Sequence, residues 1–291
     1  VADVSASGVV TGVSTGSATI TYTVTDGNGC TNSTSASVTV NASPTATVTA
    51  SGATTFCAGG TVDLTANAGT SYLWSNGAQT QTITVTTSGS YSVTVTNGSG
   101  CSTTSSAQSV TVNPLPTVAA ITGSPDVCVG STTVLASSTT GGVWSTSDAT
   151  VADVSASGVV TGVSAGSVTI TYTVTDGNGC VNSSSASVTV NALPTATVTA
   201  GGATTFCAGG SVDLTASAGA RYLWSNGAQT QTITATTSGS YTVTITNASG
   251  CSTTSAAEAV TVNPLPTVAA ITGSPDVCDG STTVLASSTT G

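Results

Sequence analysis

The chain has 291 residues with eleven acidic residues, a single Lys or Arg, no His and no Met, so its formal net charge is −10 at pH 7. This charge excludes the basic surface that binds nucleic acid and the polybasic face that binds an anionic membrane. The absence of His and Lys removes the usual general bases and Schiff-base nucleophiles, so we expect no enzyme activity. Apolar runs such as residues 118–121 are far shorter than the ~20 residues of a spanning helix, so we expect no membrane span in this segment.

The sequence repeats with a period of 150 residues, because residues 1–141 and 151–291 are nearly identical. The copies differ by small exchanges, such as Thr15 against Ala165. A weaker repeat lies inside each period, marked by short proline-stiffened linkers at Pro44, Pro116, Pro194 and Pro266. The spacing predicts two alternating domain types of about 75 residues, and the truncated copies at both ends favour a segment of a longer array.

In chain order, the first predicted strand covers residues 17–25, where apolar side chains alternate with threonine. Residues 90–96 show the same alternation further along the chain. Turn signals separate such runs at residues 26–29, 75–77, 88–89 and 97–100. Alternation with period 2 is typical of half-buried antiparallel sheet, and many short strands at regular spacing predict β-sandwiches.

Residues 143–176 carry the pattern W-S-x-S-D-x-x-V-A-x-V-S, followed by G-V-V-T-G-V and A-G-S-V-T-I-T. In this pattern the segment resembles the bacterial Ig-like type 2 domain. Residues 54–101, with C-A-G-G-T-V-D-L and Y-L-W-S-N-G-A-Q-T, and their copy at 204–251 resemble the PKD-like Ig repeats of very large Bacteroidota surface proteins. Those proteins include gliding adhesins and cargo of the type IX secretion pathway.

These resemblances imply surface display, a stalk architecture, adhesion in some members and no catalytic residue. One departure concerns the PKD-like segments, because Trp74-Ser75-Asn76-Gly77 replaces the aspartate-rich W-D-F-G-D-G stretch of ordinary PKD domains.

The predicted fold class is all-β, with tandem immunoglobulin-like β-sandwiches in an extended repeat array. The predicted domains are the C-terminal half of a type 2 domain (1–42), a PKD-like domain (43–115), a type 2 domain (116–192), a PKD-like domain (193–265) and the N-terminal half of a type 2 domain (266–291).

Eight cysteines stand at regular spacing in a chain without His and without a Cys-x-x-Cys motif. Zinc binding requires such ligand clusters, whereas regular spacing in a secreted type of sequence is typical of disulfides. The candidate residues are Cys30, Cys57, Cys101, Cys128, Cys180, Cys207, Cys251 and Cys278.

Two pairing schemes are open. The first joins cysteines within domains, as Cys57–Cys101, Cys128–Cys180 and Cys207–Cys251. The second joins neighbouring domains, as Cys57–Cys180 and Cys128–Cys251. General habit favours the first scheme. Strand order favours the second, because the Cys57 turn and the Cys101 hairpin turn are expected at opposite poles of one sandwich, beyond the ~7 Å that a disulfide allows. A third scheme, Cys30–Cys57 and Cys101–Cys128, joins poles that point apart and is disfavoured.

The aromatic residues could form a sugar platform, but Trp74, Trp144 and Trp224 have the spacing of the core tryptophan of a third strand, which we favour. Tyr91 and Tyr241 have the position of a tyrosine corner, which is also a structural role.

The Asp26-Gly27-Asn28-Gly29 segment and its copy at 176–179 contain half of the ligands of a calcium loop, and a hairpin turn is the favoured interpretation. Asp148, Asp153 and Asp3 are candidates for turn caps. No cofactor is expected, apart from a weak calcium site between domains.

Together these patterns predict a structural segment of a long, disulfide-stabilised fibre or stalk at the bacterial cell surface. The alternative is an adhesin whose Ig-like domains themselves bind glycans or surfaces, including a gliding-motility adhesin. The expected partner is the chain itself, through tandem or lateral fibre contacts, with surface glycans bound by other parts of the full protein.

Overall fold

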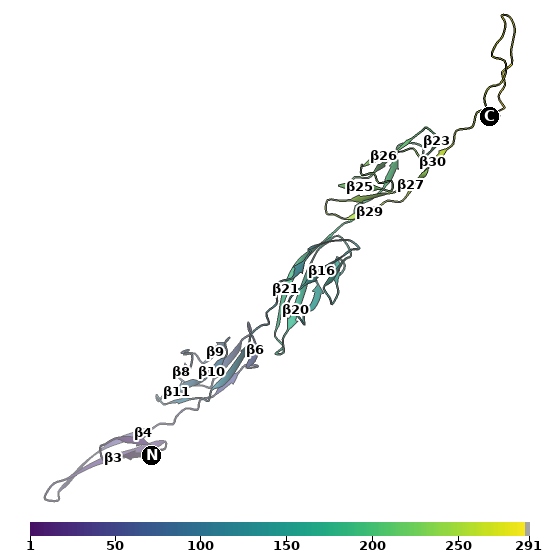
Figure 1. The fold of residues 1–291 in the computed structure, drawn as a ribbon. Helices are drawn as coiled ribbons and strands as arrows, with labels where there is room; N and C mark the ends of the chain where they lie inside the picture. Colours follow the sequence, from purple (N-terminus) through teal and green to yellow (C-terminus); the bar gives the residue numbers. More distant parts are fainter. Residues whose placement is uncertain (289–291) are drawn as a thin grey trace. The chain divides into compact units, whose positions relative to one another are not determined.

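The computed structural model describes residues 1–288, and every regular element in them is a β-strand (Figure 1). No helix in this part of the chain is long and apolar enough to cross a bilayer. Four stretches without strands divide the chain into groups, at residues 41–47, 114–121, 192–197 and 264–271. They contain the linker residues Pro44, Pro116, Pro194 and Pro266 in turn.

Residues 116–192 form two four-stranded sheets, with the orders β14-β16-β19-β18 and β15-β21-β20-β17. Side chains from both sheets share one core, which includes Leu135 and Val160 from the first sheet and Ile170 and Val188 from the second. The strands are β14 (Thr122–Gly123), β15 (Asp126–Cys128), β16 (Thr132–Ala136), β17 (Val143–Thr146), β18 (Ala152–Val154), β19 (Val159–Gly162), β20 (Gly166–Thr175) and β21 (Val181–Asn191).

Residues 43–115 form three three-stranded sheets, with the orders β5-β7-β9, β6-β13-β10 and β8-β11-β12. Pairing is antiparallel throughout, except that β6 and β13 run parallel. The strands are β5 (Val48–Ala50), β6 (Thr55–Cys57), β7 (Val62–Ala66), β8 (Ser71–Trp74), β9 (Thr82–Val85), β10 (Gly89–Tyr91), β11 (Val93–Thr96), β12 (Ser102–Thr104) and β13 (Gln108–Asn113).

Residues 193–265 repeat this arrangement, with the sheet orders β22-β24-β26, β23-β30-β27 and β25-β28-β29. The strands are β22 (Val198–Ala200), β23 (Thr205–Cys207), β24 (Val212–Ala216), β25 (Arg221–Trp224), β26 (Thr232–Ala235), β27 (Gly239–Tyr241), β28 (Val243–Thr246), β29 (Ser252–Thr254) and β30 (Glu258–Asn263).

The two ends of the chain correspond to the two halves of residues 116–192. Residues 1–42, here called the closing half, hold the pairs β1 (Ala2–Val4) with β2 (Val10–Gly12) and β3 (Gly16–Thr25) with β4 (Thr31–Val40). Residues 266–288, the opening half, contain no strand and a single bridge between Thr272 and Ala286.

The predicted strand at residues 17–25 is confirmed as β3, whereas the prediction of one strand over residues 90–96 is wrong. The structure splits this run into β10, which pairs with β13, and β11, which pairs with β8. The chain changes sheet at Ser92, whose carbonyl accepts the Ser75 N–H at 2.8 Å. Alternation alone cannot locate this change, because the side chains keep alternating through it.

Chain contacts group the residues into two compact units, Val1–Val118 with Thr173–Ser183, and Ala119–Tyr172 with Ser184–Gly291. The turn between β20 and β21 therefore belongs with the preceding residues 43–118. This grouping differs from the domains predicted from the linkers, which stay a prediction.

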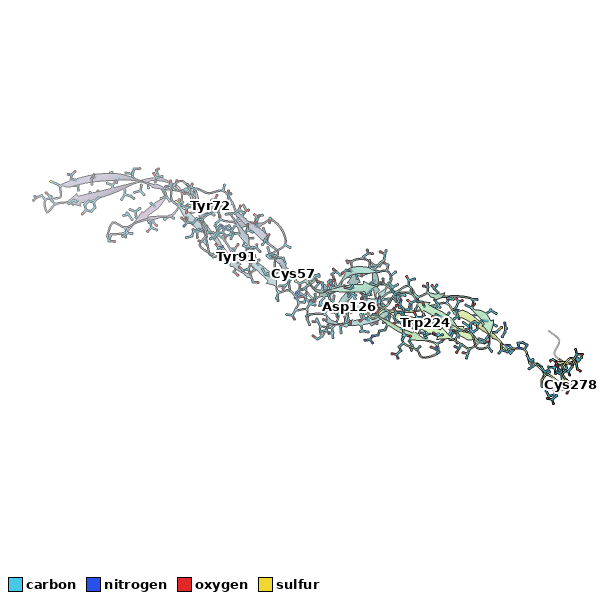
Figure 2. All side chains as sticks on the ribbon, turned by 90° about the horizontal axis from the view of Figure 1, so that it is seen from above. Cys57, Tyr72, Tyr91, Asp126, Trp224 and Cys278 are labelled. Carbon is cyan, nitrogen blue, oxygen red and sulfur yellow. A yellow bond between two sulfur atoms is a disulfide. The ribbon has the colours of Figure 1, made fainter. Side chains whose placement is uncertain are left out.

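The structure places two of the three tryptophans in cores, as the sequence predicts. Trp74 and Trp224 are each 2% exposed, and their indole N–H groups donate to the carbonyls of Thr80 and Thr230 at 2.8 Å. Figure 2 shows Trp224 among the side chains of residues 193–265. Trp144 is only half-buried.

Tyr91 and Tyr241 form the expected tyrosine corners. Both rings are buried, and the hydroxyls donate to the carbonyls of Thr87 at 3.1 Å and Thr237 at 3.0 Å. These bonds tie the loop that follows β9 to the end of β10, and the loop that follows β26 to the end of β27.

We predict that Tyr91→Phe lowers the free energy of unfolding by about 1 kcal/mol, because it removes a partly buried hydrogen bond and leaves the ring in place. Chemical denaturation followed by tryptophan fluorescence measures this change. The exposed Tyr22 supplies the control, and Tyr22→Phe should leave the transition where it was. Equal effects of both substitutions would contradict the structural role of the Tyr91 hydroxyl.

Candidate functional site: cysteines at the domain poles

The tip of the β20–β21 hairpin holds the cysteine of a tight turn. Asp176 Oδ1 accepts the N–H groups of Asn178 and Cys180, both at 2.9 Å, and the Asp176 N–H donates to the Cys180 carbonyl. Gly179 takes a positive φ of 79°, which a residue without Cβ adopts freely. The Asp-x-x-Gly-Cys sequence thus fixes Cys180 at the start of β21.

Three more hairpin turns place a cysteine in the same way. The N–H of the turn's first residue donates to the cysteine carbonyl, and that residue's side-chain oxygen accepts the cysteine N–H. These turns are Asp26–Cys30, Asn97–Cys101 and Asn247–Cys251. The four residues Cys30, Cys101, Cys180 and Cys251 are called the hairpin cysteines below.

The other four cysteines, called the first-turn cysteines, are Cys57, Cys128, Cys207 and Cys278. Each carbonyl accepts an N–H three residues further on, at 2.9 or 3.0 Å. Cys57 is the last residue of β6, which runs parallel to β13. In this pairing Cys57 lies opposite Asn113, the last residue of β13. Cys128 aligns in the same way with Asn191 at the end of β21. A first-turn cysteine therefore lies at the pole where the chain leaves the domain.

The hairpin cysteines lie at the opposite pole, where the chain arrives. Asn182 Nδ2, two residues after Cys180, donates to the carbonyl of the linker residue Pro116 at 2.8 Å. Asn247 Nδ2, in the turn of Cys251, donates to the linker carbonyl of Ala192 at 2.9 Å. A third such bond joins Asn97 Nδ2 to the carbonyl of Ala42, so side-chain amides attach the hairpins of Cys101, Cys180 and Cys251 to the linkers that precede them.

Two disulfides join these poles across linkers. Cys57 is bonded to Cys180, with a Cα–Cα distance of 5.5 Å, and Cys128 is bonded to Cys251, with 5.7 Å. Both bridges span 123 residues of sequence. Each compact unit contains one of them, and Figure 2 marks Cys57 in the first unit. The scheme that joins neighbouring domains is the one that the structure forms.

The within-domain pairs Cys57–Cys101, Cys128–Cys180 and Cys207–Cys251 are not formed, and the pairs Cys30–Cys57 and Cys101–Cys128 are not formed either. The length of β21 gives the reason in residues 116–192. Cys128 aligns with the last residue of this eleven-residue strand, and Cys180 precedes its first residue. A strand of that length spans roughly 35 Å, far beyond the reach of a disulfide.

The remaining four cysteines, Cys30, Cys101, Cys207 and Cys278, are free within the described residues. Burial follows bonding: the bonded Cys180 is fully buried, whereas its repeat counterpart Cys30 is exposed.

Of the candidate acidic residues, Asp26 and Asp176 serve turns, whereas Asp153 and Asp3, predicted as turn caps, lie in strands β18 and β1. Asp26 Oδ1 accepts the N–H groups of Asn28 and Cys30 at 2.9 Å. Asp153 Oδ1 accepts the N–H of Val154 at 2.8 Å, and its copy Asp3 lies in β1. Among residues 1–288, no group of three or more His, Cys, Asp or Glu side chains could hold a metal ion. The weak calcium site between domains stays an untested prediction.

Asp148 caps a turn in residues 116–192. The Thr150 hydroxyl donates to Asp148 Oδ1 at 2.6 Å, and this bond, together with the Thr150 N–H at 2.9 Å, lowers the pKa of Asp148 below its ordinary value. A carboxyl whose pKa is lowered by folding stabilises the folded state above its unfolded pKa, and the contribution is lost as the pH falls through the folded pKa. Asp148 therefore favours folding at neutral pH.

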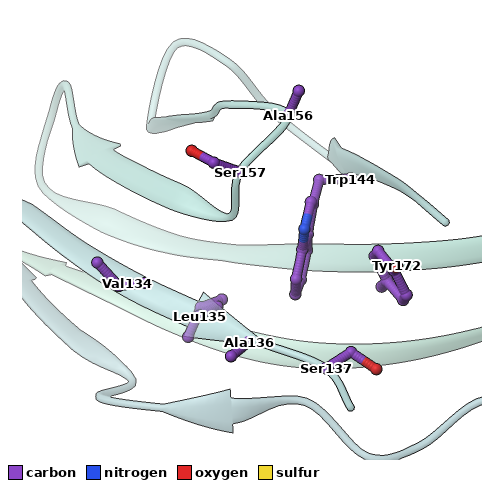
Figure 3. A pocket seen from close by; sticks show the side chains of 8 residues that line it. All are labelled: Val134, Leu135, Ala136, Ser137, Trp144, Ala156, Ser157 and Tyr172. Carbon is purple, nitrogen blue, oxygen red and sulfur yellow. The ribbon is translucent and has the colours of Figure 1, made fainter. Parts of the chain in front are cut away.

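An aromatic pair lines a shallow hollow of about 200 Å³ beside β16 (Figure 3). The Trp144 and Tyr172 ring centroids are 4.6 Å apart. The Tyr172 hydroxyl donates to the Thr139 carbonyl at 2.9 Å and accepts the Gly142 N–H at 2.8 Å. Trp144, predicted as a core residue, packs against the core but is only partly buried, a feature that its spacing in the sequence does not signal.

Residues 106–190 match the model of the bacterial Ig-like domain (group 2). This match contains residues 143–176 and confirms their resemblance to that family. The chain is an all-β series of tandem immunoglobulin-like sandwiches. The resemblance of residues 54–101 to PKD-like repeats stays a prediction, and no curated protein matches the chain.

Several solved structures of Ig-like proteins are similar. A Ca²⁺-stabilised adhesin with which an Antarctic bacterium binds ice is 18% identical, covering 85% of this chain and 82% of that chain at a TM-score of 0.32. The eight N-terminal Ig domains of the Down syndrome cell adhesion molecule are 15% identical, covering 90% of this chain and 43% of that chain at 0.38. Part of a 1.5-MDa bacterial ice-binding adhesin is 18% identical, covering 78% and 100% at 0.25. TM-scores this low carry no argument about function.

We predict that the double substitution Cys57→Ser and Cys180→Ser destabilises the protein, because it opens a closed loop of 123 residues. On the chain-entropy model, such a loop contributes about 4 to 5 kcal/mol. Denaturant unfolding of oxidised protein measures the loss. The single substitution Cys101→Ser is the control and should have little effect, whereas a comparable loss in that variant would favour the within-domain pair Cys57–Cys101.

Proposed function

We propose that this chain is a structural segment of a long extracellular fibre or stalk at a bacterial cell surface, where it supplies reach, stiffness and tensile strength. The observation that carries the proposal is the repeated disulfide register, in which a first-turn cysteine of one domain is bonded to the hairpin cysteine of the next. Disulfides persist in oxidising surroundings, which supports an extracellular location.

Each disulfide reinforces a linker. Cys57 aligns with Asn113, the last strand residue before the linker. Cys180 ends the hairpin turn that precedes Asn182, whose side-chain amide donates to the carbonyl of Pro116 within that linker. The linker is therefore closed by a covalent bond and by a hydrogen bond. A domain pair held in this way resists bending at its linker, a property that a stalk requires and a freely jointed array of binding modules does not.

The two disulfides also interleave along the sequence. Cys128 lies inside the loop closed by Cys57 and Cys180, and Cys180 lies inside the loop closed by Cys128 and Cys251. A covalent path through the chain can run to Cys57, cross to Cys180, return to Cys128 and cross to Cys251. Tension applied to the ends is carried by this short path, so residues 58–127 and 181–250, roughly half of the chain, add no length when the protein unfolds under load.

Exposed sheet faces carry hydroxyl pairs in place of charges. Thr94 and Thr104 approach at 2.8 Å across β11 and β12, and Thr65 and Thr82 approach at 3.0 Å across β7 and β9. Near-identical repeats with such uniform faces favour a mechanical role, because a receptor site requires a distinctive surface. The proposed partner is accordingly the chain itself, in tandem or lateral fibre contacts.

Single-molecule pulling from the two termini tests the mechanical proposal. With both disulfides intact, the load-bearing path comprises residues 1–57, 128–180 and 251–288. We expect the fully unfolded contour length to be roughly half that of the reduced chain, since extended residues each contribute ~3.3–3.6 Å. Equal contour lengths before and after reduction would refute the tensile role of the disulfides.

The second candidate function is an adhesin that binds glycans through its own domains, and the Trp144–Tyr172 pair favours it. Tyr172 is buried, but the half-buried Trp144 ring lines the hollow, and an aromatic ring beside a hollow is suited to a sugar face. We expect glycan binding by this route to quench Trp144 fluorescence and to be lost in Trp144→Phe. The buried Trp74 provides the control, because Trp74→Phe should leave binding unchanged. A glycan array without any hit at high protein concentration would exclude this candidate.

A further inference from the structure

The sheet β25-β28-β29 (Figure 1) carries the single Lys or Arg of the chain on its outer face. Arg221 is the first residue of β25 and is exposed. In residues 43–115, which are a near copy of residues 193–265, the corresponding position holds Ser71. Within residues 1–288, the Arg221 guanidinium forms no ion pair and no side-chain hydrogen bond. Its donors are therefore free to bind a ligand.

The backbone at Arg221 is fixed by its neighbours. Arg221 lies opposite Thr246 in the antiparallel pair of β25 with β28, and the Ala220 N–H donates to the Thr246 carbonyl at 2.8 Å. At the other end of β25, Trp224 (labelled in Figure 2) is buried in the core of the domain. The base of the arginine side chain is thus held in place, and only its flexible end has to be ordered by a ligand.

Arg221 lines an open hollow of about 530 Å³ on this face of the domain. A hollow of this size is comparable to the ~300–1,000 Å³ of small-molecule sites. Among the residues that the structure describes, no acidic one lines it. The lining side chains that could contact a ligand besides Arg221 are Leu223, Gln229, Gln231, Thr244 and Thr246.

The lining groups offer both polar and apolar contacts. The exposed Gln229 amide forms no hydrogen bond with the described part of the chain, so its donors and acceptor are available. Gln231 Nε2 donates to the Ala216 carbonyl at 3.1 Å, which fixes a second amide in the hollow. Leu223 is 52% exposed and adds an apolar surface. A sugar ring, which has hydroxyl groups around an apolar C–H face, matches this combination.

We propose that the hollow binds an acidic sugar, namely a uronate residue of a polysaccharide, with the carboxylate of the sugar on Arg221. A planar guanidinium donates two parallel N–H bonds to a carboxylate. Leu223 contacts the C–H face of the ring, and the Gln229 amide binds its hydroxyls. The inference goes beyond the proposed structural function and does not depend on it, because a stalk can carry this site whether or not its disulfides bear tension.

Charge determines the class of sugar. A neutral sugar leaves the guanidinium without an anionic partner, whereas a uronate supplies one. The chain as a whole has a formal net charge of −10 and therefore repels anionic polysaccharides. Screening limits this repulsion to about 8 Å at physiological ionic strength, so a cation in a hollow without acidic lining can still attract a carboxylate. Binding of a polyanion to this chain thus reports a local site and excludes a general attraction.

Residues 43–115 provide an internal comparison for the site. The pairing of β8 with β11 has the same register as the pairing of β25 with β28. Of the residues that line the hollow, only two differ between the copies. Ala220 corresponds to Thr70, and Arg221 corresponds to Ser71. The two copies therefore present the same sheet face with and without the cation.

The test is a titration of the full ¹⁵N-labelled chain with trigalacturonate, followed by NMR. We expect saturable shifts of the amide signals of β25, β28 and residues 229–231. The fully methyl-esterified trisaccharide is the matched ligand, because esterification keeps the ring and its hydroxyls and removes the negative charge. It should bind about tenfold more weakly or worse, the loss expected when a charge-assisted pair is removed.

Two variants locate the site. Arg221→Ser introduces the residue that the other copy already accommodates, so the domain should stay folded while its affinity for trigalacturonate falls about tenfold or more. The double substitution Thr70→Ala and Ser71→Arg rebuilds the same lining in residues 43–115. It should add a second binding site, detected as new shifts in β8 and β11.

Equal binding of the two trisaccharides, or an unchanged affinity in Arg221→Ser, would overturn the proposal. The same conclusion would follow if trigalacturonate caused no shifts at millimolar concentration, or if the rebuilt lining in residues 43–115 gained no binding. Shifts confined to the surroundings of Trp144 would assign sugar binding to the aromatic hollow and also overturn this site. None of these outcomes changes the contour length measured by pulling, so the proposed mechanical function is tested separately.

Discussion

The parallel pairing of the second strand of a domain with its last strand is the constraint on which the rest of the structure depends. β6 runs parallel to β13, and β15 runs parallel to β21. The turn that follows β6 or β15, which holds the first-turn cysteine, therefore lies at the pole where the chain leaves the domain. The last hairpin must then lie at the opposite pole, beside the preceding linker. The cysteines of these two turns cannot reach each other within one domain. The first-turn cysteine of one domain instead reaches the hairpin cysteine of the next domain.

Turn chemistry converts this topology into a precise placement of sulfur atoms. The Asx side chain that opens each hairpin turn holds the cysteine N–H, and a glycine with positive φ provides the bend directly before it. The cost of closing a disulfide is reduced when both cysteines are held in place before the bond forms. The fold therefore supplies the geometry of the bridge, and the bridge adds stability to a chain that contains one cation and no ion-pair network within the described residues.

Some of this architecture could be predicted from the sequence. The alternation of residues 17–25 was sufficient to locate β3, since strand formation there depends on a local period of two. The switch of sheet at Ser92 could not be predicted, because it depends on which distant strands pair with β10 and β11. Cysteine spacing left two bridging schemes open, since the choice depends on the pole at which each turn lies. The partial burial of Trp144 likewise depends on packing, since Trp74, which is also followed by serine, is fully buried.

The interleaving of the two bridges has a consequence for survival outside the cell. A cut in the backbone anywhere between Cys57 and Cys251 falls inside at least one closed loop, so the two fragments remain covalently connected. A protease must therefore hydrolyse at least three peptide bonds, one in each of the segments 57–128, 128–180 and 180–251, or act together with a reductant, before this part of the molecule is severed. With a single Arg and no Lys, the chain also offers almost no sites to trypsin-like enzymes. The crossed loops thus make the polypeptide tolerant of the isolated nicks that would break an unbridged chain of sandwiches at a linker.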